Sequence, residues 1–244
     1  RIDRRGELGI LGGSGMTLLE VCVDTAEGLA AAILGGADRV ELCSVLEQGG
    51  LTPYAGLMAL AGRAPVPVRA MIRPRAGDFV FTAGELEIML GDIEMARQSG
   101  LSGVVLGASL PDGRLDIEKL ERLVDEAGEM HKALHRAIDL VPDMAEAVEQ
   151  AIALGFDTIL SSGRASSAQE GIADLELAHN VADGRIAIMA GAGVNAATAP
   201  HILGRVPLGA VHGSCSEPAR PDSDAAQRLG FVSPTRQPRQ SRRA

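Results

Sequence analysis

The sequence predicts an α/β fold, a closed (β/α)₈ barrel of the TIM type, and three observations support this prediction. Short apolar runs alternate with longer amphipathic segments from Met16 onward. Eight such runs occur within about 200 residues, which indicates a parallel sheet. The units repeat at a nearly even spacing, and no G-x-G-x-x-G motif follows the first run, so an open doubly wound sheet is the second choice.

Each predicted strand is a run of mostly apolar residues that turn residues bound on both sides. Val and Ile favour strands because their branched side chains pack well on a pleated surface. In chain order, the predicted strands are Leu18–Val23, Arg39–Leu42, Val66–Ile72, Gly103–Leu106, Ala133–Ala137, Thr158–Leu160, Arg185–Met189 and Gly209–Val211.

The predicted helices lie between these strands, and several of them end at glycine. Gly36, Gly100 and Gly155 stand where a helix C-terminus favours a residue of positive φ, and a strand follows each of them closely. In chain order, the predicted helices are Ala26–Leu34, Tyr54–Arg63, Ala83–Gln98, Ile117–Ala127, Met144–Ala153, Ala168–Asn180 and Ala196–Leu203.

We expect a single barrel domain over residues 16–231, an N-terminal extension over residues 1–15 and a disordered basic tail over residues 232–244. The segment after the eighth strand, SEPARPDSDAAQRLGF, holds at most a short helix, so the last helix of the barrel is expected to be short or missing. Either the barrel is incompletely covered there or a second subunit covers it, and we expect a homodimer or a higher homo-oligomer.

Composition excludes several classes of partner. A net charge of −9 repels polyanions, so nucleic acid is not an expected partner. No apolar run approaches the roughly 18 residues that cross a bilayer, and the first residues do not resemble a secretory signal. The chain has 3 cysteines, an odd number that indicates free thiols in a reducing cytoplasm. No organic cofactor is predicted.

Two neighbouring predicted strands both contain the pattern Glu-x-Cys. Side chains two residues apart on a strand point to the same face, so Glu20 shares a face with Cys22, and Glu41 shares one with Cys43. The aliphatic residues between them are expected to contact the helices, which directs both pairs into the barrel near its C-terminal end, where such barrels place their sites. Two adjacent thiols can bind Cu(I) or zinc, although most buried cysteines are simply small hydrophobic residues.

Further polar residues gather where other predicted strands end. They are Arg73, Arg75, Asp78, His135, Arg136, Asp139, Ser162 and His212. One interpretation is a structural ion network that balances the buried acids. The other is a cleft that binds a small anionic molecule, in which the candidate catalytic residues are Glu20, Glu41, His135 and Asp139.

Small residues follow the seventh predicted strand. Gly191 and Gly193 allow backbone N–H groups to approach a ligand, and barrels often bind phosphate between the last two loops. A plain tight turn, in which Asn195 caps the next helix, is an equal alternative.

Seven motifs occur in a fixed order: EVCVD, GADRVELCS, EQGGLTP, MIRPRAGDF, HRAID, ILSSG and MAGAGVN. Together they resemble the CutC family of copper homeostasis proteins, from about Met16 to His212. The resemblance implies a cytoplasmic (β/α)₈ barrel that is often oligomeric, with Cys22 and Cys43 as Cu(I) ligands. The chain departs from the family pattern at Ala192, where glycine is usual, and at Arg164, where glycine or another small residue is common.

Three functional hypotheses follow. The first is a copper homeostasis protein that binds Cu(I) through Cys22 and Cys43. The second is an enzyme that acts at the barrel mouth on a small anionic metabolite, such as a phosphorylated one. The third is an interaction scaffold whose exposed flank, left by the incomplete last unit, binds a partner.

Overall fold

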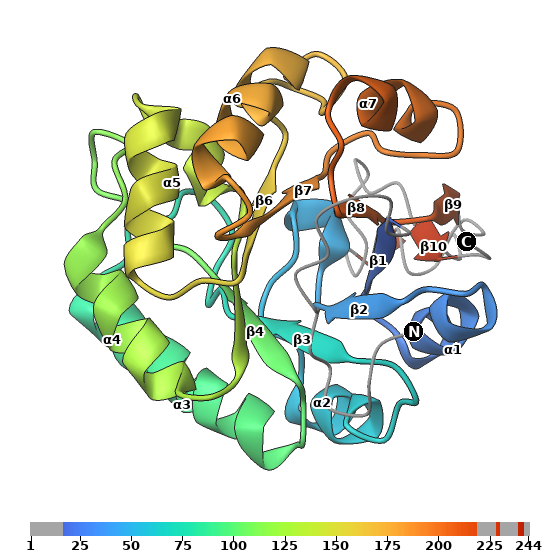
Figure 1. Cartoon of the computed structure of the whole chain (residues 1–244). Coiled ribbons are helices and arrows are strands. Elements are labelled where there is room, and N and C mark those ends of the chain that lie inside the picture. The colour runs from blue at the N-terminus through green and yellow to red at the C-terminus, as the bar shows by residue number, and fades with distance from the viewer. Residues whose placement is uncertain (1–16, 219–227, 230–238, 242–244) are drawn as a thin grey trace.

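The structure is a computed structural model that describes residues 17–218, 228–229 and 239–241. Eight parallel strands, β1 to β8, pair in chain order and close into a barrel (Figure 1). This confirms the predicted fold class. The expected extension over residues 1–15 lies outside the described residues, as does most of the expected tail over residues 232–244.

The barrel strands alternate with seven α-helices in the described part of the chain. The strands are β1 (Leu18–Val23), β2 (Arg39–Leu42), β3 (Val68–Met71), β4 (Gly103–Leu106), β5 (His131–Leu134), β6 (Thr158–Ser161), β7 (Ala187–Ala190) and β8 (Ala210–Gly213). The helices are α1 (Ala26–Leu34), α2 (Ala55–Ala61), α3 (Ala83–Gln98), α4 (Ile117–Ala127), α5 (Met144–Ala153), α6 (Ile172–Ala182) and α7 (Ala199–Arg205).

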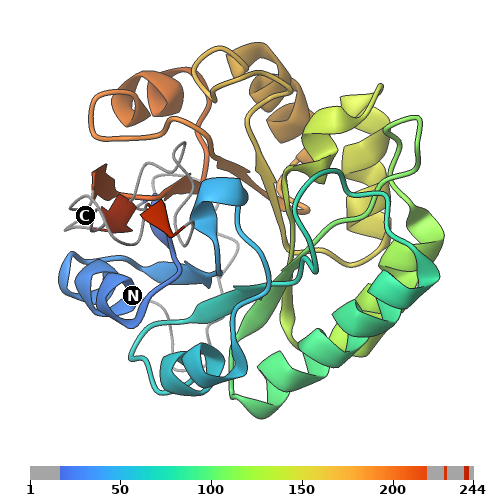
Figure 2. The same cartoon turned by 180° about the vertical axis from the view of Figure 1, so that it is seen from behind.

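Short polar side chains fix the starts of four helices. The side chains of Thr25, Thr82, Asp116 and Asp143 each accept a backbone N–H from the first turn of the helix that follows. These caps satisfy N–H groups that have no partner inside the helix. Each helix then packs on the outside of the barrel, as the two opposite views show (Figures 1 and 2).

The barrel closes where β1 pairs with β8. On one side Glu20 is level with His212 of β8, and on the other it is level with Arg39 of β2. Residues that are level on parallel strands point to the same face of the sheet, so these three side chains share the interior face. The register therefore places one acidic and two basic groups together inside the barrel.

Two apolar layers hold this arrangement. The outer one lies between the sheet and the helices and contains Val21 and Val23 of β1. The interior contains two smaller groups of buried side chains. One group consists of Leu18, Leu160, Met189 and Ala210. The other consists of Cys43, Met71, Val105 and Ala133. Between these groups the interior of the barrel is polar.

Two predicted boundaries, the end of the fifth strand and the start of the sixth helix, were wrong. The fifth strand ends at Leu134 and not at Ala137, because the Nδ1 atom of His135 accepts the N–H of Ala137 and starts a short 3₁₀ helix, η2 (Arg136–Leu140). The sixth helix begins at Ile172 and not at Ala168. Here Gly171 approaches the loop after β6 so closely that a Cβ on it would lie 1.9 Å from the carbonyl oxygen of Ser162.

After β8 the chain forms strand β9 (Ser216–Pro218), which pairs antiparallel with β10 (Arg239–Ser241). This second strand lies within the segment that was expected to be a disordered tail. Residues 219–227, in the segment that was expected to hold at most a short helix, lie outside the described residues. Among the described residues, no helix has the length and apolar character that crossing a bilayer requires.

Candidate functional site at the barrel mouth

The Glu-x-Cys pairs of β1 and β2 lie in the barrel interior. Glu20, Cys22, Glu41 and Cys43 are all buried, whereas Val21, which lies between the first pair, packs toward the helices. The alternation of side chains along both strands therefore acts as expected. Cys22 is level with Glu41 on the neighbouring strand. Cys43 lies two residues beyond Glu41, so the two thiols are offset by two residues along the strand direction.

Glu20 is the centre of a buried ion network. Its Oε2 atom accepts a hydrogen bond from Nε of Arg39, and its Oε1 atom lies 2.9 Å from Nδ1 of His212. The guanidinium of Arg39 also lies 3.5 Å from the sulfur of Met189. Burial alone raises the pKa of Glu20, but Arg39 and His212 lower it well below its usual value, so Glu20 is a carboxylate.

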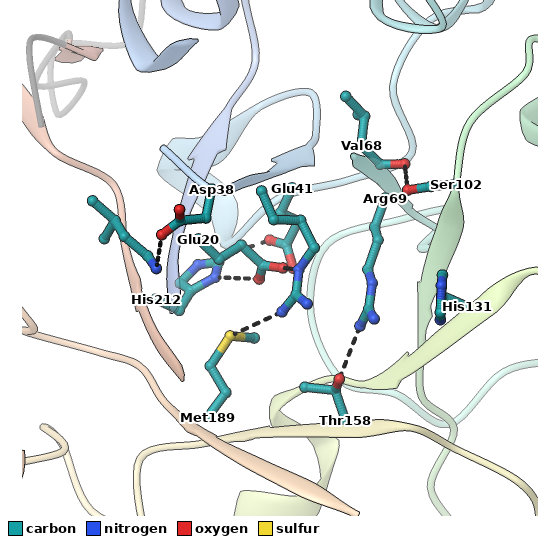
Figure 3. Close-up of polar contacts among 12 residues, drawn as sticks. Glu20, Asp38, Glu41, Val68, Arg69, Ser102, His131, Thr158, Met189 and His212 are labelled. Atoms are coloured by element: carbon teal, nitrogen blue, oxygen red, sulfur yellow. Dashed lines mark hydrogen bonds and ion pairs between the residues drawn. The ribbon is translucent and has the colours of Figure 1, made fainter. Parts of the chain in front are cut away.

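Glu41 is the less satisfied of the two acids. Its Oε1 atom lies 3.5 Å from the sulfur of Cys43 and 3.9 Å from Nε2 of His212, and its Oε2 atom is buried without a hydrogen-bond partner. Burial raises the pKa of Glu41, and the negative charge of Glu20 adds to this effect. Figure 3 shows the side chains of Glu20, Glu41 and His212 converging inside the barrel.

His212 connects the two acids with a thiol. Burial lowers its pKa, but interactions with Cys22, Glu41 and Glu20 raise it well above the usual value. In the described part of the chain, Glu20, Glu41 and His212 are the one group of three His, Cys, Asp or Glu residues whose ligand atoms all lie within 4.8 Å of one another. Two carboxylates and an imidazole are common ligands of divalent metal ions.

The two thiols have weak partners of different kinds. The sulfur of Cys22 lies 3.8 Å from the carbonyl oxygen of Gly213, and that of Cys43 contacts Glu41. Burial raises the pKa of Cys43 well above its usual value, and the nearby Glu41 and Cys22 raise it further. A Cβ on Gly50 would lie 2.9 Å from the Cys43 sulfur, so only glycine leaves the loop after β2 room to pass over this thiol.

A second polar cluster surrounds Phe79 at the ends of β3, β4 and β5. The ring of Phe79 contacts the guanidinium of Arg73 at 5.0 Å and the imidazole of His135 at 4.6 Å, and its carbonyl accepts the N–H of Ser109. Arg73 donates to the carbonyls of the loop after β2 and of Gly77. Three buried atoms of this cluster have no hydrogen-bond partner: Nε of Arg73, the hydroxyl oxygen of Ser109 and Nε2 of His135.

His135 is held as a neutral imidazole. Burial and the positive charge of Arg73 lower its pKa to about 3. Its Nδ1 atom accepts the N–H of Ala137, so its proton is on Nε2. Gly107 makes this placement possible, because a Cβ there would lie 2.1 Å from the imidazole.

Arg75 and Asp78 form contacts with each other and with the start of α3. Arg75 binds Asp78 at 2.9 Å and Glu85 at 2.5 Å, and both Arg75 and Asp78 are more exposed than Arg73. The structure therefore places these two residues on the rim and not with the two thiols.

Asp139 organises the loop after β6. Its carboxylate accepts the hydroxyls of Ser161 and Ser162, the backbone N–H groups of Ser162 and Arg164, and Nε of Arg136. With so many donors, this carboxylate holds the loop in place. The predicted residues Arg136, Asp139 and Ser162 therefore form one cluster of their own at the mouth.

Gly191 and Gly193 occupy tight positions in the loop after β7. A Cβ on Gly191 would lie 2.5 Å from the side chain of Leu160, and Gly193 has a φ of 72°. Ala192 has the same φ of 72°, and Arg164 has a φ of 56°, although both are L-residues with a side chain. The resemblance implies glycine at position 192 and glycine or another small residue at position 164, and both backbones here have the left-handed conformation that glycine favours.

The comparisons with known proteins agree with this architecture. The model of the CutC family matches residues 17–217. A CutC family protein from Sinorhizobium medicae is 55% identical over 219 residues, which cover 90% of this chain and 89% of the relative. The chain belongs to the CutC family. One from Caulobacter vibrioides is 50% identical over 220 residues, with 89% of each chain covered.

Solved structures extend the comparison. A CutC protein from Streptococcus agalactiae, described provisionally as a copper homeostasis protein, has a TM-score of 0.78 and 32% identity and covers 82% of this chain and 99% of its own. An aldolase designated QR15 has a TM-score of 0.60 at 16% identity and covers 81% of this chain and 89% of its own, so it shares the fold alone.

Sequence reasoning missed two interior arginines of this CutC-family protein. Arg39 neutralises Glu20, while Arg69 binds Asp157 at 2.7 Å. Arg69 also binds the hydroxyl of Thr158 at 3.0 Å, nearer the other end of the barrel (Figure 3). The sequence does contain a signal for the interior position of Arg39, because this residue shares a strand face with Glu41. The alternation rule that directed the acids inward directs this arginine inward as well.

Proposed function

We propose that this CutC-family protein binds Cu(I) through Cys22 and Cys43 and takes part in copper homeostasis. The observation that carries the proposal is that Cys22 on β1 and Cys43, directly after β2, both have their thiols buried on the interior face near the barrel mouth. Thiolates are soft ligands that select Cu(I) over harder ions. The provisional description of the Streptococcus agalactiae relative supports the same role.

The neighbours of the thiols fit a site that exchanges protons for metal. A thiol must lose its proton to become a metal ligand. Glu41 lies 3.5 Å from the Cys43 sulfur and can accept its proton. Because burial and Glu41 keep the pKa of Cys43 high, Cu(I) affinity should rise with pH.

The proposal includes a compartment and an assembly. Free thiols and Cu(I) are both maintained under reducing conditions, so we place the protein in the cytoplasm. A homodimer or higher homo-oligomer is the proposed assembly, and light scattering coupled to size exclusion measures it. A mass equal to one chain would exclude the oligomer without affecting the copper proposal.

The direct test of Cu(I) binding is an anaerobic titration against a competing chelator. Cys22→Ser and Cys43→Ser are compared with the wild type, and Cys215→Ser is the matched control because this third thiol is partly exposed in the loop after β8. We expect both interior variants to lose affinity and the control to keep it. Equal affinity in all four proteins would overturn the proposal.

A second candidate function is an enzyme that acts on a small anionic metabolite. It is favoured by the three unpartnered buried groups of Arg73, Ser109 and His135 around Phe79, since each can donate a hydrogen bond to an oxygen of a ligand. With a pKa of about 3, His135 donates as a neutral imidazole, so Glu41 is the better proton carrier.

Crystals soaked in phosphate or sulfate test this second candidate. We expect an anion that contacts Nε of Arg73 and Nε2 of His135, and we expect Arg73→Met to abolish its binding. Ordered waters on all three groups, with no anion at high soak concentration, would contradict the enzyme interpretation.

A further inference from the structure

Glu41 has a buried carboxylate oxygen that no group in the described part of the chain satisfies. Its Oε2 atom lacks a hydrogen-bond partner, and the residue is only 3% exposed. A buried polar atom of this kind is costly unless a ligand, an ion or an ordered water binds it. The other oxygen, Oε1, is already in contact with the sulfur of Cys43 at 3.5 Å. Glu41 therefore has one oxygen to offer to a ligand inside the barrel.

Two further ligand groups face this carboxylate. Glu20, Glu41 and His212 are all buried, and each can supply one ligand atom such that the three atoms lie within 4.8 Å of one another. Figure 3 shows the three side chains converging. They come from β1, β2 and β8, which are neighbours around the barrel, so the sheet itself holds them in place.

The separations between these groups suit one divalent ion. Two ligand atoms at about 2.1 Å from an ion lie about 3 Å apart when they are adjacent and about 4.2 Å apart when they are opposite. Oε1 of Glu20 lies 2.9 Å from Nδ1 of His212, and Nε2 of His212 lies 3.9 Å from Oε1 of Glu41. An ion takes only one ring nitrogen, and the 4.8 Å limit on all three atoms leaves a shift of about 0.6 Å for the side chains to make.

The charges around the cluster favour a cation. Arg39 donates to Oε2 of Glu20, so Oε1 of Glu20 remains directed at the imidazole of His212. With both acids ionised and the imidazole neutral, two negative charges face the single positive charge of Arg39. The charge of Arg69 is balanced separately, because its guanidinium binds Asp157 at 2.7 Å. A bound cation would therefore neutralise a net negative charge inside the barrel.

We propose that Glu20, Glu41 and His212 form a binding site for a divalent transition-metal ion such as Zn²⁺, separate from the cysteine site proposed for Cu(I). Carboxylate oxygen and imidazole nitrogen are harder ligands than thiolate and are typical of such ions. The inference goes beyond the proposed copper function, because the site uses no sulfur ligand and does not depend on Cys22 or Cys43.

The test uses Co²⁺ as the probe, because Co²⁺ substitutes for Zn²⁺ and its absorption spectrum reports its ligands. Affinity is measured with a competing chelator for the wild type, Glu41→Gln, His212→Gln, Cys22→Ser/Cys43→Ser and, as the matched control, His131→Gln. The control imidazole also lies next to a carboxylate, 3.2 Å from Asp157, but it belongs to no such group of three ligand residues in the described part of the chain.

Removal of a ligand should weaken binding strongly. We expect Glu41→Gln and His212→Gln each to lower the Co²⁺ affinity by about 100-fold or more, since loss of even an outer-shell partner of a metal ligand costs about 10–100-fold. We expect the double cysteine variant and the His131→Gln control to bind Co²⁺ as tightly as the wild type.

The spectrum keeps the test valid if Glu41→Gln or His212→Gln does not fold. Thiolate ligands give Co²⁺ an intense charge-transfer band in the near ultraviolet, whereas carboxylate and imidazole ligands do not. We expect the wild type to bind one Co²⁺ without this band, and we expect the Cys22→Ser/Cys43→Ser protein to give the same spectrum.

Two results would overturn the inference. One is the absence of Co²⁺ binding by the wild type. The other is a bound ion whose charge-transfer band disappears with the cysteines, which would place the ion on the thiols and leave the copper proposal standing. If instead Co²⁺ binds as expected while Cu(I) affinity does not depend on the cysteines, the copper proposal fails and this inference stands.

Discussion

The thiol of Cys43 lies 3.5 Å from Oε1 of Glu41, and both side chains are buried at the carboxyl end of β2. The thiol donates to the carboxylate, and the negative charge beside it disfavours the thiolate. Burial has the same effect and is the larger cause of the raised pKa of Cys43. The free protein therefore holds this sulfur protonated and unreactive until a metal ion replaces the proton.

The three thiols should differ sharply in their reactivity. Cys215 is partly exposed, whereas Cys22 and Cys43 are buried. We expect iodoacetamide to modify Cys215 in the native protein and to modify the two interior thiols only in denaturant, because the reagent needs access to a thiolate. Peptide mass spectrometry measures the three sites separately. Equal rates at all three sites in the native state would contradict the burial of the Glu-x-Cys pairs.

The buried pair of Glu20 and Arg39 should control stability. Arg39→Met removes one partner of the buried Glu20 carboxylate, leaves His212 to balance it, and should lower the free energy of unfolding by about 3 kcal/mol. The double variant Glu20→Gln/Arg39→Met should regain part of this loss. Arg97→Met, which breaks the exposed pair with Glu94, is the control and should cost at most about 1 kcal/mol. Urea denaturation checks all three, and a similar loss for both arginine variants would contradict the account.

His135 should make stability depend on pH. The folded state lowers the pKa of His135 to about 3, while an unfolded histidine titrates near 6.5. Below about pH 6.5 the unfolded chain therefore binds a proton that the folded protein does not. This proton favours the unfolded state, so the free energy of unfolding decreases progressively as the pH falls toward 3.

The measurement compares the wild type with His135→Gln. Between about pH 6.5 and 4.5, the free energy of unfolding of the wild type should fall relative to that of the variant by up to about 1.4 kcal/mol per pH unit. Comparing the two proteins removes the contributions of Glu41 and His212, which both contain. Parallel pH profiles would show that His135 is not held neutral.

Ala192 should be strained by its backbone. Its φ of 72° lies in the left-handed region, where a Cβ is unfavourable. We expect Ala192→Gly to raise the free energy of unfolding by up to about 1 kcal/mol. Ala30→Gly, at an exposed position inside α1, is the control and should lower it by about 1 kcal/mol. Losses of the same size at both positions would contradict the strain.

Sequence reasoning reached the barrel and the interior position of the acids and thiols because both follow from simple periodicities. Strands that alternate with helices at even spacing predict a closed parallel sheet, and side chains two residues apart predict a shared face. The same rule could have placed Arg39 beside Glu20.

The destinations of loop side chains could not be predicted in this way. Arg73 and Arg75 are two residues apart, yet the first turns onto Phe79 and buried carbonyls while the second binds Asp78 and Glu85 on the rim. This division depends on the path of the loop after β3, which no periodicity describes. The role of Asp139 was hidden for the same reason, since its partners come from the loop after β6.

The most direct measurement of the central claim is a crystal structure of the protein loaded anaerobically with Cu(I), with data collected at the copper absorption edge. The account predicts one anomalous peak inside the barrel, within bonding distance of the sulfurs of both Cys22 and Cys43. A peak at Cys215 alone, or a copper-loaded crystal in which both interior thiols have no metal neighbour, would contradict it.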